Sequence, residues 1–197
     1  MNAIPVDFFS GNGYNGVNQK RNDSMPQYDT YESPLGTLYL AGESGILTNL
    51  SFDPIYSCEE QSFNQNEFEA VKQWLDAYFR GEDVFPDFPM KQNGTPFQQL
   101  IWKLLLKIPF GQTVTYGDLA RQAAQILGRE KMSAQAVGQA VGHNPIAVII
   151  PCHRVVGAGG KLTGYAYGIH IKKLLLQHEQ EERVCAMQNS DISKQND

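Results

Sequence analysis

The sequence contains little cysteine and no long apolar run. Its 197 residues include three cysteines, Cys58, Cys152 and Cys185, which are odd in number and lie far apart. Such cysteines supply neither a disulfide framework nor a four-ligand zinc site, so we expect no metal. No apolar stretch approaches the roughly 20 residues of a membrane-spanning helix. The first residues also lack the basic region and apolar core of a secretory signal. The sequence therefore predicts a protein that is neither secreted nor bound to a membrane.

Acidic residues are scarce in one segment of the chain. Residues 1–90 contain 4 Lys and Arg against 14 Asp and Glu, whereas residues 91–154 contain 7 against 2. This division predicts that a polyanion contacts the second half. The density of basic residues there is ordinary, so a chance distribution is the alternative explanation.

The first half of the chain has the pattern of a small α+β unit. Residues 1–26 mix Gly, Asn, Ser and Asp with few periodic apolar positions, and we expect a loose extension there. Residues 27–90 then form an N-terminal domain, in which alternating apolar positions and Gly-containing turns predict an antiparallel meander covered by an amphipathic helix. The predicted strands are 28–32, 37–41 and 46–52, the predicted helix is 66–80, and a linker rich in Pro and Asp follows at 82–93.

Residues 91–183 predict a second, mostly helical domain. The segment Thr95–Gln98 starts a helix with an N-cap hydroxyl, a proline at the first helical position and a glutamine three residues after the cap. A last amphipathic helix carries Glu179, and a flexible polar tail is expected over residues 184–197.

Two short helices within this domain, at 117–127 and 134–141, are typical of a helix-turn-helix, although their connection is longer than the tight form. The second helix consists of small and neutral residues, so its backbone could approach a groove closely. A pair of helices that only pack together is the alternative.

The most informative stretch lies after this helix pair. The apolar run 147–150 predicts a buried strand that ends at Pro151. Cys152, His153 and Arg154 follow at once, which places a thiol and an imidazole at the end of a rigid element. A thiol becomes a nucleophile when a nearby base or positive charge favours the thiolate. The alternative is a buried cysteine that packs as a small hydrophobic residue.

The string Pro-Cys-His-Arg-Val at 151–155 occurs together with Gly-His-Asn-Pro at 142–145 and Thr-Tyr-Gly-Asp-Leu-Ala at 115–120. This combination closely resembles the O6-alkylguanine-DNA alkyltransferase family, also called methylated-DNA–protein-cysteine methyltransferases. The resemblance covers about residues 28–182. It implies an α+β fold, with an N-terminal ribonuclease H-like small sheet and helix and a mostly helical C-terminal domain that holds a helix-turn-helix and an active-site loop.

The family resemblance implies direct-reversal DNA repair, in which the alkyl group of O6-alkylguanine is transferred irreversibly to the protein itself, once per molecule. O4-alkylthymine is a further expected substrate. The expected acceptor is Cys152, with His153 as the base that acts through a bridging water. Glu179 would orient that histidine, and Asn144 would join the turn beneath the helix-turn-helix to the active-site turn.

The resemblance also assigns residues to the base pocket and to DNA. It implies a monomer without a cofactor that binds double-stranded DNA through the minor groove and flips the damaged base into a pocket. The protein would be cytoplasmic in a bacterium or nuclear in a eukaryote. The expected pocket residues are Tyr116, Val155, Tyr165, Ala166 and Tyr167, and the expected DNA-contacting residues are Gln135, Ala136, Gly138 and Arg154.

Two positions depart from the family pattern. Gln135 stands where the family usually has an arginine that fills the gap left by the flipped base, and Tyr167 stands where many members have glycine. We therefore expect weaker base flipping and a narrower pocket. Two other functions stay open from the sequence: a protein that binds alkylated bases without transfer, and a Cys-His hydrolase. The acceptor cysteine argues against the first, and the helix-turn-helix argues against the second.

Overall fold

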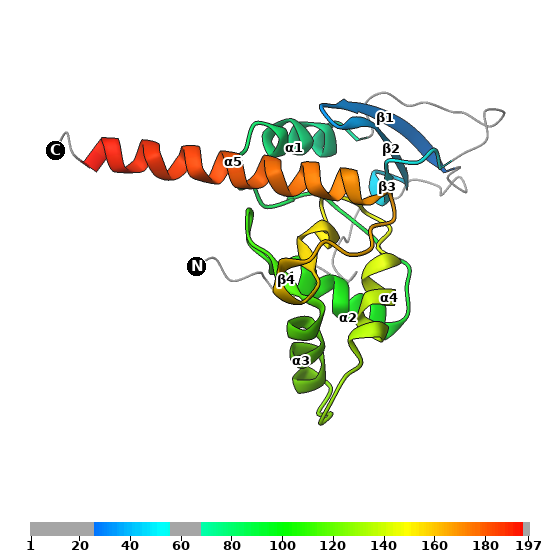
Figure 1. Ribbon diagram of the computed structural model, residues 1–197. Helices are drawn as coiled ribbons and strands as arrows, with labels where there is room; N and C mark the ends of the chain where they lie inside the picture. Colours follow the sequence, from blue (N-terminus) through cyan, green and yellow to red (C-terminus); the bar gives the residue numbers. More distant parts are fainter. Residues whose placement is uncertain (1–25, 56–67, 195–197) are drawn as a thin grey trace.

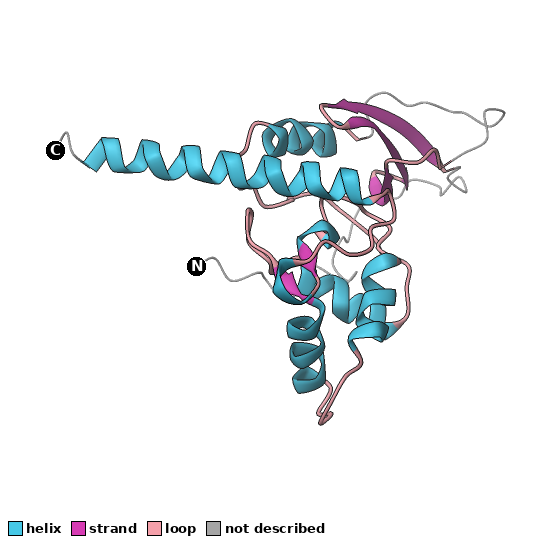
Figure 2. Ribbon diagram, viewed as in Figure 1, coloured by secondary structure: helices cyan, strands magenta, loops and turns pink. Residues whose placement is uncertain are grey.

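The computed structural model describes residues 26–55 and 68–194, with side chains up to residue 182. The expected loose extension therefore lies almost wholly outside the described residues, as do Cys58 and the side chain of Cys185. A small sheet and two helices form one part, and three helices form the other (Figure 1). Within residues 26–55 and 68–194, strands occur only in this sheet and in one short pair among the helices (Figure 2).

The predicted antiparallel meander is confirmed. Strands β1 (Gln27–Ser33), β2 (Gly36–Glu43) and β3 (Ile46–Ser51) pair in sequence order. Gly36 and Gly45 have positive φ angles of 116° and 75° in the two tight turns, a conformation that glycine adopts without strain. The sheet supplies fully buried leucines at alternate positions 38 and 40 of β2 and at positions 47 and 50 of β3, and these form part of the core together with residues of helix α1.

Helix α1 (Glu69–Phe79) confirms the predicted helix over its described residues. Residues 66 and 67, where we expected it to begin, lie outside the described part. Its inner face buries Val71, Leu75 and Tyr78, and Gly81 follows with a φ of 82°. The expected linker is bound to the sheet, because Leu47 of β3 donates its N–H to Pro89 (3.0 Å) and accepts from the N–H of Lys91 (2.9 Å).

The three predicted helices of the second part are present, and each begins with a side-chain cap, although the cap at Thr115 was not predicted. Helix α2 (Pro96–Leu105) has a capping box between Thr95 and Gln98. Helix α3 (Tyr116–Ile126) has another between Thr115 and Asp118, and Ser133 caps helix α4 (Ala134–Gly142). Helices α3 and α4 pack together and against α2. The Trp102 indole of α2 donates to the carbonyl of Ala140 of α4 (2.9 Å), which fixes the helix pair on the core.

The predicted strand at 147–150 is wrong. These residues are buried, but they form a succession of turns in which Val148 has a φ of 64°. Asn144 closes the turns, since its side chain accepts from the N–H of Ile146 (3.1 Å) and donates to the carbonyl of Ile150 (2.8 Å). An apolar run of four residues is equally compatible with a buried strand and a buried turn, and here the hydrogen bonds of Asn144 stabilise the turn.

Cysteine 152 consequently lies in a 3-10 helix, η2 (Cys152–Arg154), and not at the end of a strand. The short strand β5 (Val155–Val156) follows and pairs in parallel with β4 (Val114–Thr115), which leads directly into α3. A further 3-10 turn, η3, covers Ala158–Gly160. The β4–β5 pair therefore joins the cysteine turn to the start of the helix pair.

Helix α5 (Ile169–Lys194) is the longest element and runs beside α1 (Figure 1). It continues through residues 184–194, where we expected a flexible tail. Glu, Gln, Arg, Ala and Met favour helix there even though the apolar stripe has ended. None of the helices in the described ranges combines the length and apolarity needed to cross a membrane.

Candidate active site

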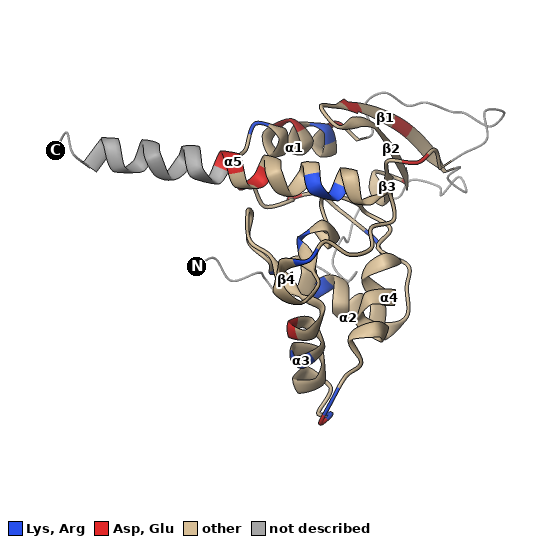
Figure 3. Ribbon diagram, viewed as in Figure 1, with Lys and Arg blue, Asp and Glu red and all other residues tan. Residues whose placement is uncertain are grey.

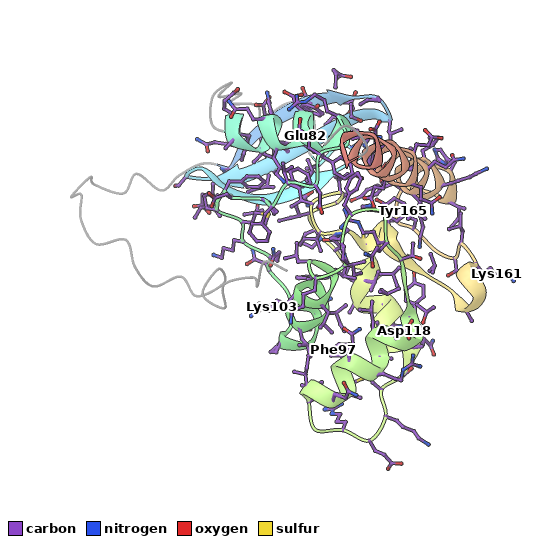
Figure 4. All side chains as sticks on the ribbon, turned by 90° about the vertical axis from the view of Figure 1, so that its left-hand side faces the viewer. Glu82, Phe97, Lys103, Asp118, Lys161 and Tyr165 are labelled. Carbon is purple, nitrogen blue, oxygen red and sulfur yellow. The ribbon has the colours of Figure 1, made fainter. Side chains whose placement is uncertain are left out.

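Cys152 lies in a cavity of about 270 Å³ between α4 and the segment that precedes α5. Its side chain is buried, with 7% of its surface exposed. Tyr165, a wall of the cavity, lies in Figure 4 where the part with the sheet meets the helical part. The lining residues are Tyr116, Gly138, Val141, Gly142, Asn144, Cys152, Gly164, Tyr165, Ala166 and Tyr167. The cavity thus combines one nucleophile with three tyrosines and several small residues, a shape suited to a flat aromatic ligand.

Asn144 binds the thiol directly. Its Nδ2 donates to the Sγ of Cys152 (3.0 Å) as well as to the carbonyl of Ile150. The side chain that shapes the turn therefore also orients the sulfur, and its donor favours a thiolate.

Glu179 of α5 organises a buried network behind the cysteine. Its Oε1 accepts from the Nε2 of His153 (2.7 Å) and its Oε2 accepts from the Nε of Arg154 (2.9 Å). The N–H of Gly111 donates to Oε2 at 3.0 Å. Burial would raise the pKa of Glu179, but the charges and hydrogen bonds of His153 and Arg154 outweigh burial and hold this pKa well below its usual range. Glu179 is therefore an ionised carboxylate.

The carboxylate fixes the tautomer of His153. An ionised carboxylate only accepts hydrogen bonds, so Nε2 of His153 carries the hydrogen and Nδ1 carries the free lone pair. Nδ1 is buried and has no hydrogen-bond partner among the described residues. Burial lowers the pKa of His153, and Glu179 offsets this only in part. The imidazole is therefore neutral near neutral pH and can accept a proton at Nδ1.

The thiol needs such a base. Burial raises the pKa of Cys152, while the Asn144 hydrogen bond and the charge of Lys172 act in the opposite direction. The resting group is therefore a thiol, and its proton must be removed before the sulfur attacks an electrophile.

Lys172 is a residue that our sequence analysis missed. It is fully buried in α5, and its Nζ donates to the carbonyls of Val155 (2.5 Å), Thr163 (3.1 Å) and Gly164 (3.3 Å). Its ammonium thus ties the cysteine turn to the segment that lines the cavity. A signal for it was present, because Lys172 shares a helical face with Leu175, a core residue, and Glu179.

Tyrosines 116, 165 and 167, which we expect to bind the base, form the aromatic walls of the cavity. The ring of Tyr167 packs edge-on against Tyr165, with centroids 5.5 Å apart, and against Phe52 beside the sheet, also at 5.5 Å. Burial, followed by the nearby Cys152 sulfur, raises the pKa of the Tyr165 hydroxyl well above its usual value. Burial likewise raises that of Tyr116. Both phenols are therefore neutral hydrogen-bond donors at neutral pH.

Two expected contacts need correction. Arg154 was expected to contact DNA, but its guanidinium is buried, where it binds Glu179 and donates from Nη1 to the carbonyl of Ile108 (2.6 Å). Val155 was expected in the base pocket, but its side chain is fully buried outside the cavity lining, and its carbonyl accepts from Lys172. Both lie in the stretch that the motif covers, where sequence cannot separate side chains that face a ligand from those that support the turn.

Helix α4 carries the other expected DNA contacts. Gln135 is exposed, Ala136 is half-buried, and Gly138 lines the cavity. A Cβ at Gly138 would lie 3.8 Å from the Tyr116 ring, so the helix backbone and this ring are close neighbours. The helix carries no charged residue, and the acidic positions lie mainly around the sheet and α1 (Figure 3). Within the described residues, no group of three or more His, Cys, Asp or Glu side chains could hold a metal ion.

The sequence matches known families and proteins over both parts of the fold. Residues 27–92 match the ribonuclease-like domain, and residues 96–181 the DNA-binding domain, of 6-O-methylguanine DNA methyltransferase. The methylated-DNA–protein-cysteine methyltransferase of Mycobacterium tuberculosis is 45% identical over 160 residues, which cover 79% of this chain and 93% of the relative. That of Methanosarcina acetivorans is 42% identical over 156 residues, which cover 77% and 97%.

Solved structures of related proteins have the same fold. The crystal structure of the M. tuberculosis O6-methylguanine methyltransferase superposes with a TM-score of 0.70 at 45% identity, covering 80% of this chain and 94% of that one. A further structure is of M. tuberculosis OGT in complex with DNA, with the same TM-score and identity, and covers 79% and 94%. The mixed α+β fold is therefore confirmed, and the chain belongs to the methylated-DNA–protein-cysteine methyltransferase family.

Proposed function

We propose that this protein repairs alkylated DNA directly, by transferring the alkyl group of O6-alkylguanine to Cys152. The observation that carries the proposal is a buried thiol in a base-sized cavity, beside a His153–Glu179 pair and a helix-turn-helix. Family relatives are named for this reaction, and one related structure contains DNA. O4-alkylthymine offers a comparable oxygen-bound alkyl group and is included as a second substrate.

The chemistry follows from the positions of the groups. The proton of the Cys152 thiol passes through a bridging water to Nδ1 of His153, which Glu179 stabilises as it becomes positive. The thiolate then attacks the alkyl carbon, a carbon–sulfur bond forms, and the carbon–oxygen bond breaks with its electron pair moving to O6. Hydrogen bonds from the Tyr116 hydroxyl to the base and from the Ala166 amide to the oxygen stabilise the departing guanine. The product thioether is stable, so each molecule acts once.

The base must leave the duplex to reach this cavity. Flipping a base out of the stack costs a few kcal/mol, least for a damaged one, and pocket contacts recover that cost. Helix α4 borders the cavity and has small residues on that side, which supports its insertion into the minor groove of double-stranded DNA. We propose that a monomer carries out the reaction, since Cys152, His153 and Glu179 together supply the nucleophile, the base and the orienting carboxylate.

The stoichiometry of transfer tests this function. A duplex that carries O6-[³H-methyl]guanine should transfer label to the protein until one methyl group per molecule is reached, with no further turnover. Retained binding to the damaged duplex without transfer would support the alternative, a protein that flags damage, and would overturn the proposal. Absence of both binding and transfer would overturn both.

Tyr167 should limit the size of the adduct. We expect Tyr167→Gly to accelerate reaction with O6-benzylguanine by about tenfold or more, because pocket fit is worth roughly 1–3 kcal/mol. The rate with O6-methylguanine in DNA is the control for the integrity of the site, and should change less. Single-turnover kinetics with both substrates measure this, and equal benzylguanine rates in the wild type and the variant would contradict it.

Gln135 should weaken base flipping relative to an arginine. The variant Gln135→Arg adds reach and charge at the gap left by the base, so we expect a several-fold faster single-turnover rate on duplex DNA and little change on single-stranded DNA. Gln139→Arg, which adds the same charge one turn further along α4, is the matched control. A Gln135→Arg rate on duplex DNA that is unchanged or lower, or that Gln139→Arg equals, would show that this interpretation of Gln135 is wrong.

A further inference from the structure

Tyr78 reaches from α1 of the N-terminal part into the network behind the cysteine. Its hydroxyl donates to Oε1 of Glu179 at 2.9 Å, across 101 positions of the sequence. Oε1 is the same oxygen that accepts from Nε2 of His153. Arg154 also donates to Oε1, from Nη2 at 3.0 Å, so the Tyr78 hydroxyl meets both the base and a cation on one oxygen atom of the group that orients the base.

The position of the Tyr78 hydroxyl is fixed by packing. The side chain is 1% exposed. Its ring stacks on Trp74 with centroids 5.4 Å apart and meets Phe110 edge-on at 5.8 Å. The ring of His178 lies 5.4 Å away, and its Nε2 contacts the Tyr78 carbonyl at 2.9 Å. A phenol held on several sides cannot easily turn away from Glu179, so the hydrogen bond is a permanent part of the site.

We propose that Tyr78 is a positioning residue for alkyl transfer, which holds Oε1 of Glu179 in line with His153 and limits how strongly that oxygen attracts the imidazole proton. The inference rests on the proposed function, in which His153 receives the proton of Cys152. It gives the N-terminal domain a direct role in the reaction, because the donor comes from α1, within residues 27–92, whereas the nucleophile, base and carboxylate come from η2 and α5, within residues 96–181.

The sign of the effect follows from hydrogen bonding to a charged group. A donor on Oε1 stabilises the carboxylate and makes this oxygen a weaker acceptor for the proton on His153. When the hydroxyl is removed, Glu179 binds an imidazolium more strongly, so the pKa of His153 rises. The other groups that act on the imidazole are Arg154 of η2 and Lys172 of α5, and both cations oppose its protonation. Arg154 donates to the same Oε1, so the effect of removing the Tyr78 hydroxyl is measured with this donor in place.

Tyr78→Phe keeps the packed ring and removes only the hydroxyl. A hydrogen bond of this kind is worth about 0.5–1.5 kcal/mol, so we expect transfer to slow by about 2- to 10-fold at neutral pH. The acidic limb of the pH–rate profile should also move to higher pH. Single-turnover rates on an O6-methylguanine duplex across about pH 5–8 measure both effects. ¹⁵N NMR titration of His153 in the free protein measures its pKa independently of activity.

Tyr31→Phe is the matched control. Tyr31 also lies in the N-terminal domain and also donates to a carboxylate, but that carboxylate is Asp76 (2.7 Å) and the pair is exposed, whereas the Tyr78–Glu179 pair is buried. The control should leave the rate and the profile unchanged. A second variant, with 3-fluorotyrosine at position 78, retains the hydroxyl as a stronger donor, and should move the acidic limb and the His153 titration to lower pH.

The outcomes separate the possible roles. A shift of the profile and of the His153 titration with Tyr78→Phe, and in the opposite direction with fluorotyrosine, supports the proposal. A uniform loss of rate without a shift of the profile identifies a structural role for Tyr78 and overturns the proposal. A Tyr78→Phe protein with the same rates and the same His153 titration as the wild type also overturns the proposal. If the wild type itself transfers no methyl group, the proposed function fails, while the NMR titration still decides whether Tyr78 controls His153. If Tyr78→Phe does not fold, the fluorotyrosine protein decides by the same two measurements.

Discussion

Cys152→Ser should reduce methyl transfer to below detection while the protein still binds methylated duplex DNA. Serine nearly preserves the volume of the side chain and can still accept from Asn144, so the cavity and its turn stay intact. Its hydroxyl, however, is a far weaker nucleophile than a thiol, and His153 cannot activate it enough to displace guanine from a methyl carbon. We expect no labelled protein after incubation with O6-[³H-methyl]guanine DNA, and an unchanged affinity in a gel-shift measurement.

The other two cysteines provide the controls for this experiment. Cys58→Ser and Cys185→Ser should each retain full transfer, because the proposed chemistry uses one sulfur. Label appearing on the Cys152→Ser protein at the wild-type rate would mean that the acceptor lies elsewhere in the chain.

Glu179→Ala should lower both stability and activity. The change leaves the guanidinium of Arg154 buried without its carboxylate, along with the hydroxyl of Tyr78 and the N–H of Gly111. Breaking a buried ion pair from one side typically costs about 3–5 kcal/mol. The neutral His153 also loses the group that fixes its tautomer. We therefore expect a loss of that size in the free energy of unfolding, and transfer slower by about 100-fold or more, as for removal of a general base.

The difference in free energy of unfolding between the wild type and Glu179→Ala should become smaller as the pH falls. The folded pKa of Glu179 lies below that of glutamate in the unfolded chain, which is about 4.3. Its stabilising contribution is therefore complete above that pH and declines as the pH falls toward the folded value. Urea unfolding of wild type and variant at several pH values measures this. Glu179→Gln, which keeps the shape without the charge, is the milder comparison, and a wild-type advantage that grows toward acid pH would contradict the account.

Local signals made much of the fold predictable from sequence. Thr95, Thr115 and Ser133 begin their helices with side-chain caps, and Gly36 and Gly45 turn the meander, because each of these choices depends on a few neighbouring residues. Tyr116, Tyr165, Ala166 and Tyr167, which the family resemblance assigns to the base pocket, line the cavity around Cys152.

Contacts between distant segments were harder to predict. Burial of Arg154 depends on Glu179, 25 positions away, and on the carbonyl of Ile108, 46 positions away, and nothing in the motif itself distinguishes this arginine from one that faces DNA. Tyr78 lies in the helix that we predicted only as an amphipathic cover for the sheet, and its hydroxyl acquires a role only through its hydrogen bond to Glu179 in α5. The turns at 147–150 were not predicted for a different reason. Their side chains are apolar like those of a buried strand, so the sequence does not indicate the backbone conformation that the Asn144 hydrogen bonds impose.

Mass spectrometry of the wild-type protein tests the central claim most directly. After the protein is mixed with excess O6-methylguanine duplex and digested, the account predicts one methyl group per chain, located on the peptide that contains Cys152, with the corresponding guanine restored in the DNA. An unmodified Cys152 peptide alongside repaired DNA, or a methyl group on another residue, would contradict it.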